Sequence, residues 1–482
     1  MRKALGLMAV LLVAGSTAVG WCATTIYAAH DQVTFTQTIL AGDPAAAEEL
    51  SVQTYATYDD RLFWDSTTNL HGDAPQTQTE YRFYNTEQEY QSDQSYPGVT
   101  IYSATQSGGS NFLDTPKYRQ NGLERAYQEL YDSAANGQEV KKTIRVADYC
   151  EYYPLEGFIG LAGINYDFGI WRYQDSNSAD LMVQKKLQEF FRIPVLPTEQ
   201  LTISLTKYSD GSLGTGTSNE AGEQFYLETQ STVTPTTCYF TFNTHTSEGN
   251  IVDTSLIPGG YGIYALDYTA GVVQIREDGI TQVTENGMLQ LDSLRMVYPI
   301  DATEELLQLG QWEADGTLLL YTRIANDYYL TIIATDTMHQ VQRLKLHSAQ
   351  TDSSAWYNLF QNDDYIVTII DQTVTVLLPN GDGTFHIDMQ TSAMADSSYL
   401  PWSVDGKAIA YQDGRLAFAT EGYNKDTGMR DNVSFDLIVL DAHGIQLCAN
   451  YQSSLQNDLT ESYSSDEIVR LIYDHPIQLA WK

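Results

Sequence analysis

The sequence predicts a mainly β protein, a β-propeller of seven or eight blades with two inserted helices, preceded by an N-terminal transmembrane or signal helix. Three observations support this fold class. Short apolar runs rich in Val, Ile, Leu, Thr, Tyr and Phe fill the chain after Leu201, turn dipeptides separate them, and the turns recur at intervals typical of one four-stranded blade. The chain has 482 residues, of which 43% are hydrophobic, so a large core can form.

The first thirty residues determine the expected location of the protein. Arg2 and Lys3 precede an uncharged, largely apolar stretch from Ala4 to Ala29. A basic flank followed by an apolar run directs insertion with the N-terminus inside. We predict that residues 1–29 anchor the protein in a bacterial cell membrane by a single pass, with residues 30–482 outside as one extracytoplasmic propeller domain. Cleavage of this segment as a signal peptide, which would give a secreted protein, is the alternative.

The charge balance and the cysteines exclude several classes of protein. Lys and Arg number 26 and Asp and Glu number 62, for a net charge of -36. Binding to phosphate backbones requires a basic surface, so we expect no nucleic-acid partner. Cys150, Cys238 and Cys448 lie far apart, without a Cys-x-x-Cys pair. The sequence therefore predicts neither a disulfide framework nor a structural zinc site.

The N-terminal third alternates expected strands with polar turns. The strands are predicted at residues 33–40, 50–58, 61–64, 81–84 and 99–103. Two segments have helical periodicity instead. The first helix is expected near 122–135, with Leu123, Ala126, Tyr127, Leu130 and Ala134 on one face before Asn136-Gly137 ends it. The second is expected near 179–192, with Ser178 as N-cap, Val183, Leu187, Phe190 and Phe191 facing inward, and Pro194 after its end.

The rest of the chain reads as consecutive antiparallel hairpins. Six dipeptides suited to positive φ occur there: Asp210-Gly211, Asp278-Gly279, Asn286-Gly287, Asp315-Gly316, Asp405-Gly406 and Asp413-Gly414. Markers at Gly222, Gly271, Asp315, Asn362, Asp405 and Asp466 are separated by 49, 44, 47, 43 and 61 residues. Steps near 45 residues match one propeller blade. The long last step has a polar insertion at residues 420–433, which we interpret as a protruding loop. A chance alignment of turns in a β-sandwich is the competing interpretation.

One segment carries a resemblance to a known family. Trp402-Ser403-Val404-Asp405-Gly406-Lys407 leads into the apolar run from Ala408 to Tyr411, and a second run from Asp436 to Leu440 ends at Asp441-Ala442-His443-Gly444. This pattern resembles the repeat of TolB-type, WD40-like β-propellers, although Val404 stands where that family usually has Pro. Gln311 to Tyr321 is a weaker copy. The resemblance covers about a fifth of the chain and implies architecture only, because such propellers serve as binding platforms and as peptidase domains.

The sequence predicts no catalytic residue, no metal ligand and no cofactor. The sequence has no Gly-x-Ser-x-Gly elbow, no phosphate-binding loop and no His-Glu-x-x-His helix. Ser204 and Lys207 match Ser-x-x-Lys, but in a strand-like run rather than at a helix start. The oxygen-rich segment Asn380 to Asp388 lacks the ligand pattern of an EF-hand and is predicted as a hairpin turn. Tyr residues, including Tyr152-Tyr153, are expected mainly in packing.

These observations favour a noncatalytic, membrane-tethered, extracytoplasmic propeller that recognises a protein, peptide or glycan at the cell envelope. No ligand-binding residue can be assigned from the sequence. A secreted glycan-active hydrolase or lyase that uses carboxylates on the propeller face is the alternative, since Asp and Glu are abundant. A third hypothesis is a structural envelope component with loops that bind calcium. A deep pocket with buried acids would favour the hydrolase, and a shallow solvated face would favour binding.

Overall fold

The structure, a computed structural model, describes residues 2–29, 33–58, 62–71, 75–82, 99–104, 122–153, 156–161, 186–187, 189–210, 212–218, 225, 229–269, 272–275, 281–285, 288–312, 316–349, 357–392, 408–424, 429–455, 469–471 and 477–482. The chain forms two compact units. Unit 1 comprises Met1–Asp93 and Ser353–Lys482, and unit 2 comprises Gln94–Asp352. Each unit is described by itself. The single propeller domain over residues 30–482 stays a prediction.

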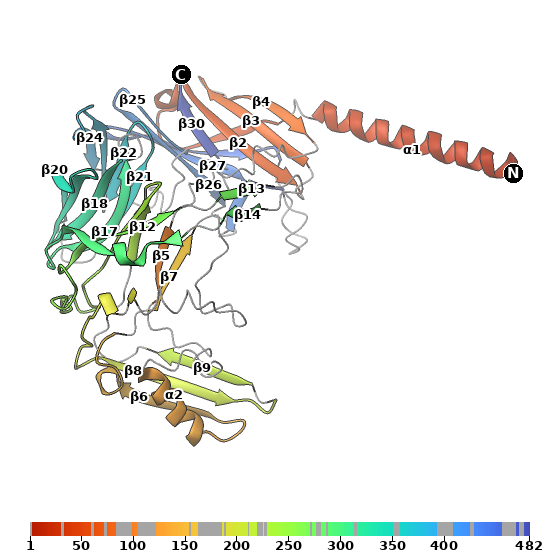
Figure 1. Ribbon diagram of the computed structural model, residues 1–482. Coiled ribbons are helices and arrows are strands. Elements are labelled where there is room, and N and C mark those ends of the chain that lie inside the picture. Colours follow the sequence, from red (N-terminus) through yellow and green to blue (C-terminus); the bar gives the residue numbers. More distant parts are fainter. Residues whose placement is uncertain are drawn as a thin grey trace. The chain divides into compact units, whose positions relative to one another are not determined.

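The described residues of unit 1 form three antiparallel sheets. Strands of these sheets are labelled in Figure 1. The first has the order β1 (Phe35–Gly42), β28 (Gly444–Ser453), β27 (Met429–Asp441), β26 (Arg415–Asn424) and β25 (Ile409–Gln412). The second is β21 (Tyr357–Gln361), β22 (Ile366–Ile370), β23 (Thr373–Pro379) and β24 (Phe385–Ser392). In the third, β2 (Leu50–Tyr58), β3 (Leu62–Leu70) and β4 (Gln76–Arg82) are joined by β29 (Val469–Leu471) and β30 (Ile477–Trp481), both paired with β2.

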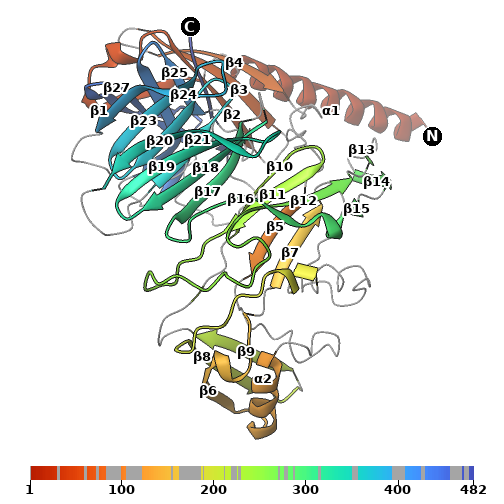
Figure 2. The ribbon, with the colours of Figure 1, turned by 60° about the vertical axis from the view of Figure 1, so that its left-hand side comes forward.

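In unit 2, the part of the chain that the structure describes forms five antiparallel sheets. Their strands are labelled in Figure 2. One is the meander β17 (Glu305–Trp312), β18 (Thr317–Ile324), β19 (Asp327–Ala334) and β20 (His339–Ser348). A second contains β10 (Thr229–Val233), β11 (Thr237–Phe242), β12 (Gly262–Thr269), β15 (Met288–Leu289) and β16 (Arg295–Pro299). The smaller ones are β6 (Glu139–Arg145), β8 (Gln200–Lys207) and β9 (Leu213–Ser218); β5 (Val99–Ala104) and β7 (Glu156–Leu161); and β13 (Val272–Ile275) and β14 (Thr281–Glu285).

The chain is therefore mainly β, with several four-stranded antiparallel sheets of the kind expected for propeller blades. Successive hairpins form β17 to β20, β21 to β24 and β25 to β28 in chain order, which confirms the predicted meanders. Leu318 to Tyr321 in β18 and Ile366 to Ile370 in β22 are buried at every position. A strand buried on both faces needs a continuous apolar run rather than an alternating one. Such apolar runs explain why the strands of these blade-like sheets could be predicted from the sequence.

Segments from opposite ends of the chain complete two sheets of unit 1. Strand β1 pairs with β28, and β29 and β30 pair with β2. Aromatic packing reinforces the first of these pairings, because the Phe435 ring lies 5.3 Å from that of Phe35 and stacks at 4.8 Å on that of Tyr451. The Gln37 amide also donates a 2.8 Å hydrogen bond to the Tyr451 hydroxyl. The pairing of β1 with β28 thus rests on side-chain contacts as well as on backbone hydrogen bonds.

The two expected inserted helices lie in unit 2. Helix α2 (Gly122–Ser133) confirms the first, with Ala126, Tyr127 and Leu130 buried and Gly137 at φ +77° beyond its end. The second is described only in part: residues 186–187 and 189–190 are helical, and residues 178–185 lie outside the described residues. Phe191 confirms its inward face, since its ring meets that of Tyr264 edge-on at 4.8 Å.

The predicted strands and turns agree with the structure at many positions. The run 50–58 is strand β2 itself, and 99–103 lies within β5, whereas β4 begins five residues before the expected 81–84. Asp413 and Gly414 have φ of +50° and +76°, as a tight hairpin between β25 and β26 requires. Asp210 likewise lies in the turn between β8 and β9. Gly211, Asp278-Gly279, Asn286-Gly287, Asp315 and Asp405-Gly406 lie outside the described residues.

One local prediction was wrong in part. Within the segment 420–433, which was expected to be a loop, residues 420–424 and 429–433 belong to β26 and β27, which pair from Glu421–Phe435 to Asn424–Met429 across a register shift; residues 425–428 lie outside the described residues. Polar side chains do not prevent this, since antiparallel pairing uses the backbone groups. Of the residues that follow the marker Gly222, Phe225 makes an isolated antiparallel bridge to Thr246, and residues 226–228 lie outside the described residues.

The N-terminal segment forms helix α1 (Arg2–Ala29). Its large apolar side chains, such as Leu12, Val19 and Trp21, are exposed. In the part of the chain that the structure describes, no helix has the length and apolar character needed to cross a bilayer. The predicted transmembrane anchor is therefore not supported. Cys150, Cys238 and Cys448 are buried thiols, in agreement with the absence of a disulfide framework.

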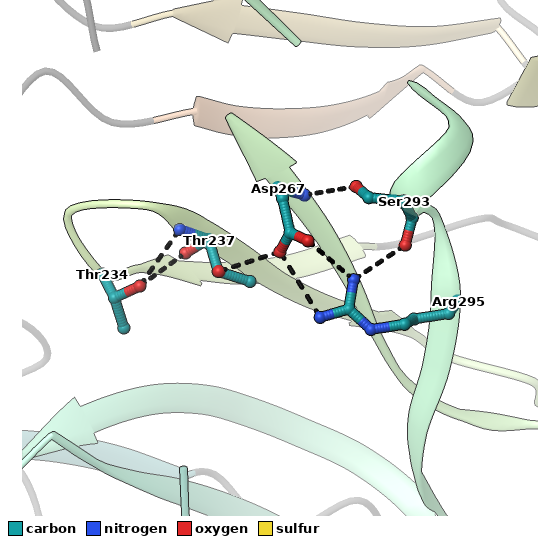
Figure 3. A network of polar contacts seen from close by, with 5 residues as sticks. All are labelled: Thr234, Thr237, Asp267, Ser293 and Arg295. Carbon is teal, nitrogen blue, oxygen red and sulfur yellow. Dashed lines mark hydrogen bonds and ion pairs between the residues drawn. The ribbon is translucent and has the colours of Figure 1, made fainter. Parts of the chain in front are cut away.

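A polar network fastens one sheet of unit 2 at its surface (Figure 3). The Asp267 carboxylate on β12 accepts hydrogen bonds from the Thr237 hydroxyl on β11, at 2.9 Å, and from the Arg295 guanidinium on β16, at 3.0 Å. The Ser293 hydroxyl accepts from the Asp267 backbone N–H at 2.7 Å. Thr234 and Thr237 close the turn between β10 and β11. Because the chain itself engages the carboxylate oxygens, we assign this network a structural role.

Candidate functional site

The strongest candidate site is a groove in unit 1 with a volume of about 640 Å³, which we call the aromatic groove. Three segments far apart in the sequence form it: the end of β21 with the turn after it, strand β25, and strand β30. Its lining residues are Gln361, Asn362, Asp364, Tyr365, Ile409, Ala410, Tyr411, Gln412, Gln478, Leu479, Ala480 and Trp481. Each of these strands lies at the edge of a different sheet.

The first wall of the aromatic groove is a tight turn between β21 and β22. The Asn362 side-chain oxygen accepts hydrogen bonds from the backbone N–H groups of Asp364 and Tyr365, at 2.9 and 3.0 Å. The Asn362 N–H in turn donates to the Tyr365 carbonyl at 3.1 Å. Asn closes turns in this way because its short amide replaces a backbone acceptor. The turn thereby fixes where Tyr365 enters the groove.

Three aromatic side chains of the groove have their polar ends bound by the protein. The Tyr365 hydroxyl donates to the Ile409 carbonyl at 2.9 Å, and the Trp481 indole N–H donates to the Ala410 carbonyl at 3.2 Å. The Tyr411 hydroxyl donates to the Asp388 carboxylate on β24. These bonds hold the rings in place and leave their apolar faces as the part that a ligand can contact.

The hydroxyls of both tyrosines stay protonated. Burial raises the pKa of Tyr365. Burial also raises the pKa of Tyr411, and the hydrogen bond to the Asp388 carboxylate raises it further, because a neighbouring negative charge disfavours the phenolate. Neither tyrosine is therefore prepared to act as a base near neutral pH. Their rings lie 5.9 Å apart and meet at 65°.

A cation supports the far side of the groove. The Arg415 guanidinium carbon lies 4.3 Å from the centroid of the Trp481 ring. Arg415 also forms an ion pair with Glu49 at 3.7 Å, which contributes little because the Glu49 side chain is well exposed. A guanidinium stacked on an indole fixes the plane of the ring by cation–π attraction. Trp481 is thus held by its N–H and by this contact.

The polar lining of the groove consists mainly of side-chain amides. Gln361, Asn362, Gln412 and Gln478 contribute them, and Asp364 is the one carboxylate among the described lining residues. No Lys, Arg or His belongs to that lining. Amides both donate and accept hydrogen bonds. The arrangement can therefore hold an uncharged polar ligand against aromatic rings, and none of its lining side chains is positively charged.

A second groove in unit 1, with a volume of about 620 Å³, lies over β2, β3 and β4. Its lining is Val33, Gln53, Asp65, Thr67, Thr77, Gln78, Thr79 and Glu80. Asp65 and Glu80 are direct partners across the strand pair. Because this described lining has no aromatic ring to orient a ligand, we rank the groove below the aromatic groove.

The residues weighed for chemistry in the sequence take structural positions. Ser204 and Lys207 lie in strand β8 as expected, where the Ser204 hydroxyl contacts the Gly216 carbonyl at 3.4 Å and the Lys207 ammonium lies 3.8 Å from the Tyr131 ring centroid. Tyr153 is buried, and its hydroxyl donates to Glu199. These contacts agree with packing and cation–π roles.

The oxygen-rich segment 380–388 contains the hairpin turn between β23 and β24, as predicted, and its last four residues begin β24. The Asp382 carboxylate accepts hydrogen bonds from the Thr384 hydroxyl and from the Thr384 N–H, the latter at 3.0 Å. These bonds lower the pKa of Asp382 because they favour its charged form. Among the described residues, no group of three or more His, Cys, Asp or Glu side chains is placed to hold a metal ion.

The sequence indicated pieces of the aromatic groove but not their convergence. Asn362-Asp363 and the run 408–411 were recognised as turn and strand markers of two successive blades. Strand β30 was not recognised, although the alternation of Ile477, Leu479 and Trp481 with polar or small residues was a visible signal. Tertiary packing determines how segments more than 40 residues apart are aligned. The sequence pattern therefore did not predict that these residues lie together.

Comparisons with known proteins do not assign the chain to a family. No protein-family model and no curated protein matches the chain. Among solved structures it is similar to a protein from Lactobacillus plantarum, with 14% identity, 56% of this chain and 68% of that chain covered, and a TM-score of 0.25. It is also similar to a candidate 6-phosphogluconolactonase from Bacteroides uniformis, with 11% identity, coverage of 54% and 84%, and a TM-score of 0.21. A functionally unknown protein from Desulfotomaculum acetoxidans has 11% identity, coverage of 51% and 77%, and a TM-score of 0.17. Because these scores are low, they carry no statement about activity.

Proposed function

We propose that this protein is a noncatalytic, extracytoplasmic binding protein whose ligand occupies the aromatic groove. The observation that carries the proposal is the groove itself, where edge strands of three sheets converge with their aromatic rings held in place. Sites of this kind join apolar surface with a few fixed polar groups. The ligand classes are those expected from the sequence, namely a protein, a peptide or a glycan of the cell envelope.

We also propose that the sheets belong to one propeller of seven or eight blades. The support is the series of three successive four-stranded meanders and the completion of two sheets by segments from opposite ends of the chain. In a ring of blades, pairing of distant segments closes the circle and removes exposed edges. The edge strands β21, β25 and β30 would then line the inner side of the ring, and the aromatic groove would open there.

The proposed location outside the cytoplasm rests on the basic flank and apolar run at residues 1–29 and on the net charge of -36. We expect protease added to intact source cells, with any outer envelope made permeable, to degrade the protein while a cytoplasmic marker enzyme survives. Immunoblotting with an antibody against unit 2 measures this. Protection equal to that of the marker, lost only on lysis, would contradict an exported location.

Blocking the aromatic groove should abolish ligand binding without unfolding the protein. Ala480 lines the groove and is exposed, so Ala480→Tyr adds a ring to the groove without entering the core. Calorimetric titration of the full-length protein with decapeptides and with neutral and acidic hexasaccharides should identify a ligand whose affinity falls at least about tenfold in this variant, a cost near 1.4 kcal/mol.

The matched control adds the same ring outside the groove. Ile387→Tyr changes an exposed residue of β24 that does not line the groove, and it should bind like the unaltered protein. The proposal fails if no member of the panel binds, or if Ala480→Tyr and Ile387→Tyr bind equally well. Cleavage of a bound oligosaccharide by the unaltered protein would overturn the noncatalytic role and favour the hydrolase alternative.

A further inference from the structure

We propose that the ligand of the aromatic groove is a neutral oligosaccharide. This inference rests on the proposed binding function and deepens it by naming a ligand class. Three independent features of the groove lead to this class: the charge of its lining, the hydrogen-bonding character of its polar groups, and the fixation of its rings.

The charge of the lining disfavours anionic ligands. The described lining has no Lys, Arg or His, and Asp364 is an exposed carboxylate. The nearby Arg415 guanidinium stacks on Trp481 and forms an ion pair with Glu49. The whole chain adds a net charge of -36. A negative field lowers the local concentration of anions and leaves neutral molecules unaffected. Nucleotides, phosphorylated ligands, acidic sugars and acidic peptides are therefore poor candidates for the groove.

The polar groups of the lining match hydroxyl groups. Gln361, Asn362, Gln412 and Gln478 each carry an amide with a carbonyl acceptor and an NH₂ donor. A sugar hydroxyl also donates and accepts, so one amide can satisfy both functions of one or two neighbouring hydroxyls. A ligand recognised mainly through charge would instead require ions in the lining. Four amides in one groove thus favour a polyhydroxylated, uncharged molecule.

The rings provide apolar surface for the faces of sugar rings. Tyr411 and Trp481 are half-buried, so part of each ring remains open, whereas Tyr365 is buried and supports Tyr411. Their hydroxyl and N–H groups are bound by Asp388 and by the Ala410 carbonyl. Rings held in this way lose little conformational entropy when a ligand stacks on them. The 640 Å³ volume lies within the range of about 300–1,000 Å³ found for ligand sites.

An extended peptide fits the same geometry less well. A peptide that adds to a sheet edge needs backbone groups that are open to it. In β25, the carbonyls of the consecutive residues Ile409 and Ala410 already accept hydrogen bonds from Tyr365 and Trp481. Successive carbonyls of a strand point to opposite sides, so one of these two lies on the open edge of β25. There an incoming strand would compete with a side chain that is already bound. The groove therefore favours a ligand that contacts side chains over one that pairs with the backbone.

The test is calorimetric titration of the full-length protein with four neutral hexasaccharides, which are the β-1,4-linked hexamers of glucose, N-acetylglucosamine, mannose and xylose. An acidic hexamer of galacturonic acid and neutral decapeptides serve as comparison ligands. We expect binding of at least one neutral hexamer, with an affinity that changes less than about twofold between low and high salt because no ion pair is formed. Binding of the acidic hexamer should be at least tenfold weaker.

Matched variants separate ring stacking from the other contacts. Tyr411→Ala removes the ring and should lower the affinity for the neutral hexamer at least about tenfold. Tyr411→Phe keeps the ring, and its affinity should stay within about threefold of that of the unaltered protein. Gln478→Ala should weaken binding severalfold through loss of one amide. Circular dichroism shows whether Tyr411→Ala folds. If it does not, Gln478→Ala and Ala480→Tyr still test the binding site, because both change side chains that are not buried.

The outcomes distinguish this inference from the function on which it rests. The protein could bind only peptides or only the acidic hexamer, and lose that binding in Ala480→Tyr. This result would contradict a neutral oligosaccharide as the ligand, but it would still support the binding function of the groove. Neutral binding that Tyr411→Ala and Gln478→Ala both leave unchanged would also overturn it. Absence of binding by every ligand, or binding unaffected by Ala480→Tyr, would remove the binding function itself.

Discussion

Deletion of residues 477–482 is expected to unfold the sheet of unit 1 that contains β2, β3 and β4. Strand β30 pairs with β2 from Leu50–Trp481 to Thr54–Ile477, and both Ile477 and Leu479 are buried. Burial of each side chain is worth about 1.5–3 kcal/mol, and uncovering Leu50 and Val52 adds a similar loss, so we expect a cost of about 5 kcal/mol or more. That is a large share of the roughly 5–15 kcal/mol that stabilises a typical domain.

Amide hydrogen exchange followed by mass spectrometry measures this effect within one molecule. Peptides from residues 50–70 should lose their protection in the truncated protein. Peptides from residues 305–348 lie in unit 2 and provide an internal reference that should exchange as before. Removal of Lys482 alone leaves every residue of β30 in place and is the matched control. Unchanged protection of residues 50–70 after the longer deletion would show that β30 is dispensable.

Gly42→Ala is expected to destabilise unit 1 by about 3 kcal/mol or more, which corresponds to a fall in Tm of roughly 10 °C for a unit of this size. Gly42 ends β1 with φ of +84°, a conformation that costs an L-residue about 1–2 kcal/mol. A Cβ atom there would also lie 2.0 Å from the carbonyl oxygen of Gln446. Because the obstructing atom is backbone, β1 or β28 must shift, and the Asp43–Gln446 hydrogen bond of 2.9 Å is lost.

Gly381→Ala is the matched control for this substitution. Gly381 also lies in unit 1 and has φ of +74°, but nothing is within 4 Å of the position its Cβ would take. Gly381→Ala therefore measures only the cost of placing an L-residue at a positive φ. We expect this cost to lower Tm by only a few degrees. Scanning calorimetry of both variants gives the comparison. Equal shifts would mean that the contact with Gln446 does not determine the stability of the β1–β28 pairing.

The sequence predicted individual strands and hairpins better than it predicted their partners. Strand β2 and the Asp413-Gly414 turn were found because alternation and positive φ leave local signals in the chain. The turns at Ala325 and Asp371 also have positive φ, at +52° and +54°, but no glycine marked them. The extension of β26 and β27 was missed because backbone pairing leaves no compositional trace where the side chains are polar.

The candidate site was less predictable than the fold for a physical reason. Tyr365 comes from the turn between β21 and β22, Tyr411 from β25 and Trp481 from β30. These strands belong to three different sheets, so the approach of the rings depends on how those sheets pack. Sequence periodicity reports which face of one strand is buried, but not which other strand lies opposite that face. The abundance of tyrosine added to the difficulty, since Tyr264, Tyr328 and Tyr451 are fully buried core residues with no relation to the groove.

The pairing of β1 with β28 and of β2 with β30 has a consequence for biosynthesis. When the ribosome has made residues 35–82, the strands that complete their sheets, at 444–453 and 477–481, do not yet exist. Unit 2 is synthesised as one continuous segment and can begin to fold earlier, because domains form as soon as their residues emerge. Unit 1 therefore stays incomplete until residues 444–453 and 477–481 have been synthesised. Its early strands have to wait without their sheet partners while the whole of unit 2 is made, so the last step in folding of unit 1 depends on segments that are made long after the strands they complete.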